Sequence, residues 1–596
     1  HNQKKNGTPS MVSSIFYFIR LIFAISPFYV IGELLWGISM FLPPRLVSVI
    51  GIKYIIDVYT SGERLERIYY AVGVIAAVFI GSRLLSWLYR EFYWNIGRER
   101  VFAKLSEQLY EKAKSLDLEK YDNPEFYTDF ILTIESSSDN VQQLMNLVRN
   151  YFSDVVSLIA ISSVMLTIDP LCLVIIFAVV LAFIPLSKKV GALQMERRAD
   201  NAKFHRRSDY FQRIFYLQDY AKEVRMNGIR PLLYQRYDES ADDVIENQKQ
   251  YWGKISLYYF MQEAGVQVLG FMALLPLYLG YLVLVKKTIT AGDFVAAFNG
   301  AYSIAMSINF ITVWAVARFS ERAKMIEKFR EFLHTESKIN DGDTVAKNAA
   351  PQEIRLENVT FTYPGNEEPT LKNISLTVKP YEKIALVGYN GAGKTTLTNL
   401  LMRLYDADSG SIKIGKEDIR EMTVASHRER FAVVYQDYQT YACTLGENVA
   451  MNVSPDREKA KTALQKSGFS KDLKNGLDTE LLREFDKDGQ MLSGGESQKA
   501  AVARVFYKKC PYAILDEPSA NLDPIAEYNL NQAMMKAAED KTVIFISHRL
   551  STTVNADRIY VMENGEIIEQ GTHQELMAMN GTYAYMFNLQ AEKYQN

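Results

Sequence analysis

A chain of 596 residues is too long for a single compact core, and its length predicts three or four structural units. The net charge of −2 with 23% charged residues excludes a strongly basic or acidic chain, so no nucleic-acid partner is expected. The three cysteines, Cys172, Cys443 and Cys510, are too widely spaced for a disulfide framework or a zinc site.

The character of the chain changes at about residue 335. Residues 1–10 are polar and precede Met11, and we expect them to be a leader or an added extension. Residues 11–335 carry repeated apolar runs and predict a transmembrane domain. Residues 336–352 are expected to be a linker, and residues 353–596 have the alternating strand and helix patterns of a soluble α/β domain.

Six apolar runs in the first half are candidate membrane spans. About 20 mostly apolar residues cross the ~30 Å hydrocarbon layer, and several runs reach that length only with their mildly polar flanks. A single short run of this kind would also suit a buried helix of a soluble protein. Six in one domain predict a helical bundle that crosses the membrane. The runs begin at Phe28, Tyr70, Val155, Leu171, Val266 and Phe294.

The connections between the runs differ in length. Only Asp169 and Pro170 separate the third and fourth runs, and residues 286–292 separate the fifth and sixth. The second-to-third and fourth-to-fifth connections are long, charged and helix-forming, which predicts helices of at least ~60 Å that project beyond the bilayer. Because these connections hold most of the Lys and Arg, they and both termini are expected in the cytoplasm.

Turn signals interrupt the two long projections. Asn-Pro occurs in residues 121–130 and Asn-Gly in residues 219–237. Each tip is expected either to carry a short crosswise helix that contacts what lies beneath it, or to be a solvated helical turn.

A glycine-rich loop in the second half matches a phosphate-binding pattern. The sequence GYNGAGKT, from Gly388 to Thr395, follows a strand pattern and precedes a helix pattern. Its backbone N–H groups are expected to wrap the phosphates of ATP, with Lys394 adding charge and the Thr395 hydroxyl binding Mg²⁺. The predicted nucleotide ligands in this loop are Gly388, Asn390, Gly391, Gly393, Lys394, Thr395 and Thr396.

Two further strand patterns end in residues suited to phosphoryl chemistry. Asp516 ends an apolar strand and is predicted to hold the metal's hydration shell. Glu517 follows it and is predicted to accept a proton from the attacking water. His548 follows the next strand and is predicted to reach the γ-phosphate, although a lone histidine is more often structural. The predicted catalytic residues are Glu517, His548 and Lys394.

A second candidate anion site lies a hundred residues after the first. Ser493, Gly494 and Gly495 stand directly before a helix pattern, where unpaired N–H groups and the positive end of the helix dipole attract an anion. The residues alone leave open which anion this second site holds.

The order of these motifs, with VVYQD around Gln436 and LSGGE around Ser493, resembles the ATP-binding cassette (ABC) exporters, including Gram-positive bacterial peptide and multidrug exporters. The resemblance implies a half-transporter, with a six-helix α-helical transmembrane bundle fused to one α/β P-loop nucleotide-binding domain. It also implies a multi-pass protein of the bacterial cytoplasmic membrane, with the nucleotide-binding domain in the cytoplasm.

The resemblance assigns further residues. It implies that Tyr363 stacks on adenine, that Gln436 joins Thr395 and Asp516 around Mg²⁺, and that Asp523 lies in a loop facing the opposite subunit. The tips of the two projections resemble the family's coupling helices. In this family the helix start at residues 493–496 caps the γ-phosphate held by another subunit, so a homodimer is implied.

Two departures from the family pattern stand beside the second anion site. Glu496 occupies a position where the family usually has Gln. The stretch REFDKDGQM, which precedes LSGGE, lacks the Gly-Glu-Arg-Gly sequence that is usual in the family. We expect nucleotide binding to tolerate both departures. The contacts between this region and the coupling helices are expected to differ in detail from those of the family.

The function implied by the resemblance is ATP-driven export of a peptide-like or amphipathic substrate by alternating access. A lipid flippase or multidrug exporter is the alternative, an ATP-gated channel or regulatory membrane ATPase is more distant, and an importer of this architecture is rarer. Besides a second copy, the implied partners are membrane lipid and the substrate. Glu33 and Glu263 either line a substrate cavity that attracts cations or pair with an arginine such as Arg83.

Overall fold

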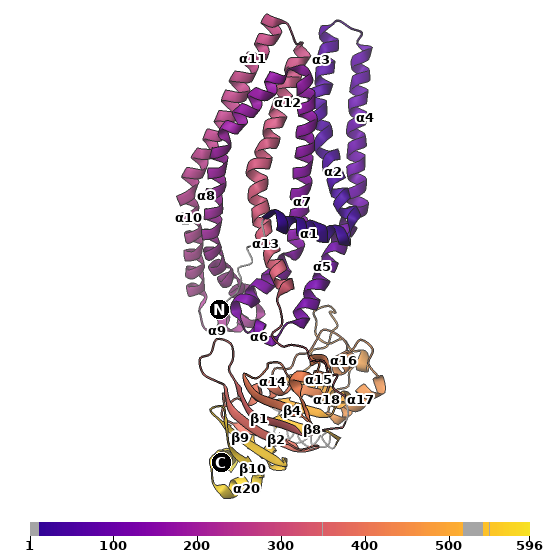
Figure 1. The fold of residues 1–596 in the computed structure, drawn as a ribbon. Coiled ribbons are helices and arrows are strands. Elements are labelled where there is room, and N and C mark those ends of the chain that lie inside the picture. The colour runs from indigo at the N-terminus through magenta and orange to yellow at the C-terminus, as the bar shows by residue number, and fades with distance from the viewer. Residues whose placement is uncertain (1–10, 348–349, 517–539, 548, 596) are drawn as a thin grey trace. The chain divides into compact units, whose positions relative to one another are not determined.

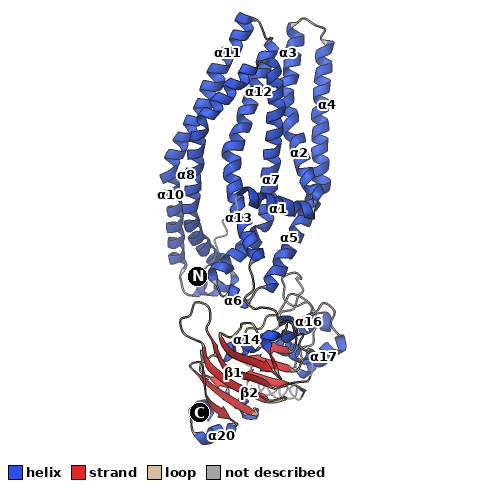
Figure 2. Ribbon diagram, viewed as in Figure 1, coloured by secondary structure: helices blue, strands red, loops and turns tan. Residues whose placement is uncertain are grey.

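The computed structural model describes residues 11–347, 350–516, 540–547 and 549–595 (Figure 1). The chain divides into two compact units. The membrane unit comprises His1–Lys114 and Thr128–Thr335, and the cassette unit comprises Ser115–Tyr127 and Glu336–Asn596. The described part of the membrane unit is helical, whereas the cassette unit contains the strands (Figure 2).

The elements of residues 11–335 are helices, some with π-helical turns (η1, η2, η4, η5 and η6) inside a continuous helix. The elements are α1 (Met11–Ile25), α2 (Pro27–Leu46), η1 (Val47–Gly51), α3 (Ile52–Thr60), α4 (Glu66–Tyr89), η2 (Arg90–Trp94), α5 (Asn95–Ser115), α6 (Leu118–Tyr121), α7 (Pro124–Ile168), α8 (Pro170–Tyr216), η3 (Gln218–Tyr220), α9 (Ala221–Met226), α10 (Arg230–Ala264), η4 (Gly265–Leu274), α11 (Leu275–Tyr281), η5 (Leu282–Lys286), α12 (Ala291–Asn309), η6 (Phe310–Ala315) and α13 (Val316–His334).

Six of these helical stretches in the described residues are long and apolar enough to cross a membrane, which confirms the predicted bundle. In their most apolar windows only 11–50% of the residues are buried, so many apolar side chains face outward, as contact with lipid requires. The stretches are Pro27–Thr60, Glu66–Ser115, Asp139–Ile168, Pro170–Arg197, Arg230–Lys286 and Ala291–Thr312.

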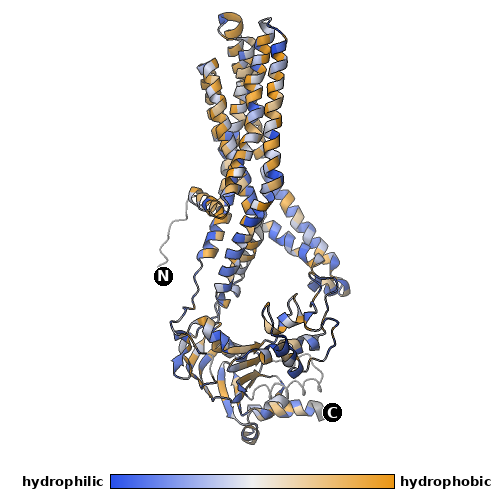
Figure 3. Ribbon diagram, turned by 90° about the vertical axis from the view of Figure 1, so that its right-hand side faces the viewer, coloured by the Kyte–Doolittle hydropathy of each residue, from blue (hydrophilic) through white to orange (hydrophobic). Residues whose placement is uncertain are grey.

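The long helices extend well beyond a hydrocarbon layer. Helices α7 and α8 contain 45 and 47 residues. At 1.5 Å per residue each is about 70 Å long, more than twice the hydrocarbon thickness. Hydrophilic residues concentrate where these helices continue toward α6 and α9, and hydrophobic residues cover the opposite portion (Figure 3).

The two short turns of the bundle have polar caps. The Asp169 carboxylate accepts from the backbone N–H of Leu171 at 2.7 Å, and Pro170 occupies the first position of α8. Thr290 and Asp293 form a capping box at the start of α12. These caps explain why so few residues suffice to reverse the chain at each turn.

The short helix of the first tip begins before the expected range, whereas α9 of the second tip lies within it. In the first tip the short helix is α6, and residues 124–130 already belong to α7. The Asn123 side chain accepts from the N–H of Phe126 at 3.2 Å, and Pro124 suits the first position of a helix, so the Asn-Pro signal starts α7. In the second tip η3 is followed by α9, which ends at Met226, and α10 begins at Arg230.

The cassette unit is built on two sheets. The larger has the order β10-β9-β3-β8-β7-β6, parallel except for β10, and the smaller is the antiparallel sheet β2-β1-β4-β5. The strands are β1 (Ile354–Phe361), β2 (Leu371–Val378), β3 (Lys383–Gly388), β4 (Ser409–Ile414), β5 (Glu417–Asp418), β6 (Phe431–Val434), β7 (Tyr512–Asp516), β8 (Thr542–Ile546), β9 (Arg558–Glu563) and β10 (Glu566–Gly571).

Helices surround the larger sheet. Every residue of β7 and β8 is buried, as expected for parallel strands covered on both faces. The helices of this unit, besides α6, are α14 (Lys394–Leu401), η7 (Ile419–Glu421), α15 (Val424–Glu429), α16 (Leu445–Ala450), α17 (Arg457–Lys466), η8 (Gly476–Asp478), α18 (Gly494–Tyr507), η10 (Leu550–Asn555), α20 (His573–Met579) and α21 (Thr582–Gln595).

A fully buried histidine lies in α15, at the core of the cassette unit. The Nε2 atom of His427 is 2.8 Å from the backbone oxygen of Leu401. Because a carbonyl oxygen only accepts, Nε2 carries a hydrogen. The Nδ1 atom is buried and has no hydrogen-bond partner among the described residues, which favours the neutral ring. Burial lowers the pKa of His427 to about 4, and the neighbouring arginines Arg430, Arg403 and Arg428 add to the effect.

This histidine makes the cassette unit sensitive to acid. At this histidine the unfolded chain binds a proton near pH 6.5, and the folded chain binds one only near pH 4. The free energy of unfolding is therefore highest above pH ~6.5 and falls as the pH decreases toward ~4, by on the order of 2–3 kcal/mol. His427→Gln keeps an N–H donor but does not titrate, and we expect it to weaken this pH dependence. Hydrogen exchange of α14 and β6 in the full chain measures it. Identical pH profiles for both proteins would contradict the assignment.

Candidate nucleotide-binding site

The predicted phosphate-binding residues gather at one edge of the larger sheet. The glycine loop follows β3, Asp516 ends β7, and Gln436 lies two residues after the end of β6. Strand β8 pairs in parallel with both β3 and β7, and β7 pairs in parallel with β6. Because parallel strands end at the same edge, residues from three separate segments meet there, as ligands do in open α/β sheets.

The glycine loop requires glycine at two positions. Gly388 has φ 152°, and an added Cβ would collide with the backbone oxygen of Met562 in β9. Gly393 has φ 97°, and an added Cβ would lie 2.6 Å from the side chain of Leu371. A side chain at either position would therefore strain the backbone and displace the loop from its neighbours.

Lys394 lies back across its own loop. Its Nζ donates to the backbone oxygens of Gly388 and Tyr389, at 2.9 Å each, and the residue is only 5% exposed. The positive charge is thus held inside the curve of the loop. A positive charge surrounded by backbone groups of a glycine loop suits a phosphate ligand.

Thr395 and Asp516 meet at the start of α14. The Thr395 hydroxyl donates to Oδ2 of Asp516 at 3.1 Å, and Asp516 is 5% exposed. A hydroxyl and a carboxylate beside a phosphate loop are oxygen ligands of the kind that Mg²⁺ takes together with phosphate and water. These residues therefore fit a magnesium nucleotide, and Gln436 is exposed at the same edge.

Tyr363 lies beside the glycine loop. Its hydroxyl is 3.2 Å from the hydroxyl of Thr396 in α14, and its ring packs edge-on against Phe361 and Tyr405. The predicted adenine platform is thus next to the predicted phosphate site. Glu517, His548 and Asp523 lie outside the described residues, so their roles stay predictions.

The second anion site begins a 14-residue helix, α18. Ser493 and Glu496 form a capping box in which Glu496 Oε2 accepts from the N–H of Ser493 at 2.7 Å. Lys471 also donates to Glu496 Oε2, at 2.8 Å, and this hydrogen bond lowers the pKa of the carboxyl group. Since Glu and Gln both close a capping box, the unusual residue keeps the helix start intact. Its carboxylate serves the helix itself, and a contact with nucleotide stays a prediction.

The start of α18 faces open space. Ser493 and Gly494 are exposed, and a Cβ added to Gly494 would meet nothing within 4 Å among the described residues. The backbone oxygen of Gly494 accepts from Tyr438 at 2.9 Å, which holds the helix start in place. Packing among the described residues therefore gives no reason for a glycine at this position.

Residues 115–127 of the first tip belong to the cassette unit and are held there by contacts that the motifs did not indicate. Tyr405 donates to Oδ2 of Asp122 at 2.5 Å, and burial and this hydrogen bond raise the pKa of Tyr405. Asp117 accepts from the Ser337 hydroxyl and from the N–H of Lys338. Because the Tyr405 ring also contacts Tyr363, at 5.3 Å between centroids, the tip is linked to the predicted adenine platform. The only sequence signal was an aromatic residue soon after the α14 pattern.

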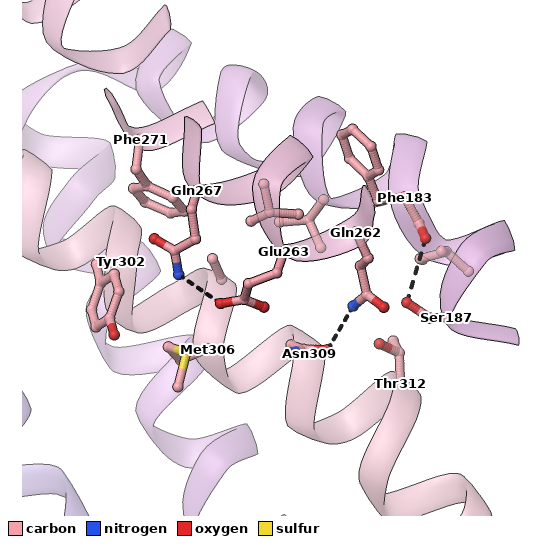
Figure 4. A pocket seen from close by; sticks show the side chains of 14 residues that line it. Phe183, Ser187, Gln262, Glu263, Gln267, Phe271, Tyr302, Met306, Asn309 and Thr312 are labelled. Atoms are coloured by element: carbon pink, nitrogen blue, oxygen red, sulfur yellow. Dashed lines mark hydrogen bonds between the residues drawn. The ribbon is translucent and has the colours of Figure 1, made fainter. Parts of the chain in front are cut away.

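The two membrane glutamates have different surroundings. Glu33 is fully buried, pairs with Arg149 at 3.1 Å and accepts from the Trp94 Nε1–H at 2.7 Å. Its arginine partner is Arg149 rather than Arg83. Glu263 instead lines a pocket formed by α8, the α10–η4 segment, α12 and η6 (Figure 4).

The role of Glu496 is testable by two substitutions. Glu496→Gln keeps the capping box and loses the ion pair with Lys471, so we expect stability and ATP hydrolysis close to those of the unchanged protein. Glu496→Ala removes the cap and should cost about 1 kcal/mol of stability. Thermal unfolding and ATPase rates of the full chain measure both. Equal losses for the two variants would show that the charge, not the cap, matters.

Comparison with known proteins identifies the cassette. Residues 371–520 match the family model described as ABC transporter. The subtilin transport ATP-binding protein SpaT of Bacillus subtilis is 28% identical over 94% of this chain and 92% of its own length. The ATP-dependent lipid A-core flippase of Aliivibrio fischeri is 32% identical over 59% of this chain, a match that spans 60% of the flippase. The same flippase of Vibrio parahaemolyticus is 33% identical over 54% of this chain and 55% of its own length.

A solved structure matches both units. A bacterial Atm1-family ABC exporter with ATP bound superposes with a TM-score of 0.78 at 23% identity, covering 95% of this chain and 99% of that chain. The fold is therefore that of an ABC exporter. The described residues contain six helical stretches that are long and apolar enough to cross a membrane, which agrees with the expected membrane location. The chain is thus similar to ABC transporters: residues 371–520 match their family model, and SpaT is similar along 94% of the chain.

Proposed function

We propose that two copies of this chain form an ATP-driven exporter for a peptide-like or amphipathic substrate. The observation that carries the proposal is the exposed start of α18, where an unhindered glycine lies at the positive end of a capped helix. Such a start attracts phosphate. The chain's own glycine loop already surrounds Lys394, so a second phosphate-binding group is useful when it belongs to another copy.

Each ATP is enclosed between two copies in this proposal. One copy supplies Lys394, Thr395 and Asp516, and the other supplies the Ser493 to Gly495 helix start. A two-fold dimer then contains two equivalent sites, because each copy presents both surfaces. Asp523 lies near the partner's site, and Gln436 completes the groups around Mg²⁺.

The same residues support hydrolysis. Lys394 holds the γ-phosphate, Glu517 accepts the proton of the attacking water, and His548 contacts the γ-phosphate. Bound Mg²⁺ neutralises phosphate charge. ATP binds the closed dimer more tightly than the open one, since only the closed form completes both sites, and hydrolysis removes this preference. The contact of Tyr405 with Asp122 in the first tip supports transmission of that change to the membrane helices.

Relatives support a peptide substrate and leave lipid as the second candidate. SpaT, named for subtilin transport, is similar along nearly the whole chain. The flippases named for lipid A-core are slightly more identical, but over a shorter part of the chain. A multidrug exporter uses the same machinery, whereas an ATP-gated channel would need no hydrolysis to sustain flux.

Transport into inside-out vesicles tests the function. We expect ATP-dependent accumulation of a cationic amphipathic peptide above its external concentration, because a pump works against a gradient. Lys394→Ala should reduce the rate at least about tenfold by removing a phosphate-binding charge. A labelled lipid and a dye serve as parallel substrates. Flux that only equalises the concentrations, or that persists in Lys394→Ala, would favour a channel.

The shared ATP site is testable by complementation between two defective copies. Lys394→Ala and Gly494→Asp should each inactivate a homodimer. In a mixed dimer of the two, both defects fall in one site if the sites are shared, and the other site is intact. Mixed dimers isolated with two affinity tags should therefore regain ATPase activity at least about tenfold above either homodimer.

The matched control carries both substitutions in one copy and neither in the other. Shared sites predict that both sites of this dimer are damaged, whereas a site built within a single copy predicts one intact site. Activity in the control and none in the complementing pair would overturn the proposal.

A further inference from the structure

A small polar pocket lies inside the membrane unit, among α8, the α10–η4 segment, α12 and η6 (Figure 4). It has room for about 30 Å³. A cavity that holds one water molecule needs at least ~10–15 Å³, so the pocket accepts one or two water-sized groups. It is too small for a peptide and large enough for one small polar group. We call it the acidic pocket.

Glu263 supplies the charge of the acidic pocket. Its Oε1 accepts from Nε2 of Gln267 at 3.2 Å, and within the described part of the chain no lysine or arginine pairs with it. Glu33, in contrast, is paired with Arg149. A carboxylate in a membrane segment is costly unless a positive or hydrogen-bonding group accompanies it.

Gln262 adds a buried acceptor. It is 6% exposed, and its Nε2 donates to Oδ1 of Asn309 at 3.1 Å. Its Oε1 is buried and has no hydrogen-bond partner among the described residues. A buried acceptor without a donor costs about 1–3 kcal/mol, so a ligand that brings an N–H group gains by supplying it.

Aromatic rings complete the lining. Phe271 and Tyr302 pack edge to face with centroids 5.9 Å apart, and Figure 4 shows them on the Gln267 side of Glu263 with Phe183 on the other side. Tyr302 is 45% exposed, so this wall continues onto an accessible surface. Aromatic faces attract cations, which adds to the effect of the carboxylate.

We propose that the acidic pocket binds a primary ammonium group of the exported substrate, a lysine side chain or the amino terminus of a peptide. The proposal rests on the proposed export function and names the substrate chemistry that its membrane unit selects. An ammonium group is about the size of a water molecule and carries three donors. Glu263 and Gln262 supply a charge and an unpaired acceptor, whereas the larger planar guanidinium group exceeds the room available.

Binding of dansylcadaverine, a fluorescent primary amine, tests the proposal. The full chain is placed in phosphatidylcholine nanodiscs, whose lipid has no primary ammonium, and titrated at neutral pH, where the amine is protonated. We expect Glu263→Gln to weaken binding at least about tenfold, and Gln262→Met about threefold to tenfold, because charged hydrogen bonds contribute more than neutral ones. The N,N,N-trimethyl analogue keeps the charge without donors and should bind the unchanged protein at least about tenfold more weakly.

Controls separate this pocket from general charge and from misfolding. Glu246→Gln makes the same change on α10 at a side chain that is 81% exposed, and should leave the affinity unchanged. Glu263→Asp retains a carboxylate and should retain the preference for the primary amine. Equal affinity for both amines in the unchanged protein, or equal affinity in Glu263→Gln and Glu246→Gln, would overturn the proposal.

Competition identifies the source of the ammonium. A peptide with one lysine and an acetylated amino terminus, and a lysine-free peptide with a free amino terminus, should each displace the probe if their ammonium group fits. Displacement by phosphatidylethanolamine in the nanodisc, but by neither peptide, would overturn the assignment to a peptide. Because the titration requires no turnover, vesicles that fail to accumulate substrate would refute export and leave the pocket result standing.

Discussion

The parallel pairing of β3, β8 and β7 is the constraint on which the cassette's chemistry depends. Strand β8 pairs Ile546 with Leu386 of β3 and with Asp516 of β7, so the carboxyl ends of the three strands lie at the same edge of the sheet. This alignment brings Thr395, at the start of α14, within 3.1 Å of Asp516, 121 residues later in the chain. A change of register by one residue would turn Asp516 to the other face of the sheet and break this contact.

The start of α18 has to meet two demands at once. The helix must satisfy its first N–H groups, and the Ser493–Glu496 capping box does so from within the chain. In the proposed dimer it must also remain open to a phosphate, which the exposed Gly494 permits. Glutamate at position 496 is compatible with both demands, because its carboxylate turns to Lys471 and the N–H of Ser493. The cap therefore places a negative charge at the helix start without leaving it unpaired.

The membrane unit contains two glutamates with different surroundings. Glu33 has a guanidinium and an indole N–H beside it, so its charge is satisfied within the bundle. Glu263 has amide neighbours, which accompany the charge without neutralising it. Such a carboxylate retains its attraction for a cation from outside the chain. The difference between the two glutamates arises from α7, which brings Arg149 to Glu33.

By itself the sequence determined the six spans, the helical projections and the order of the phosphate-binding motifs. These features depend on local composition, on glycine positions such as Gly388 and on strand-ending residues such as Asp516, all of which are readable along the chain. The tertiary structure decided which distant residues meet. Arg149 as the partner of Glu33, Tyr405 as the anchor of Asp122, and Lys471 as the partner of Glu496 join positions 116, 283 and 25 residues apart. No local pattern marks such pairs, because helix packing and loop closure bring them together only in the folded chain.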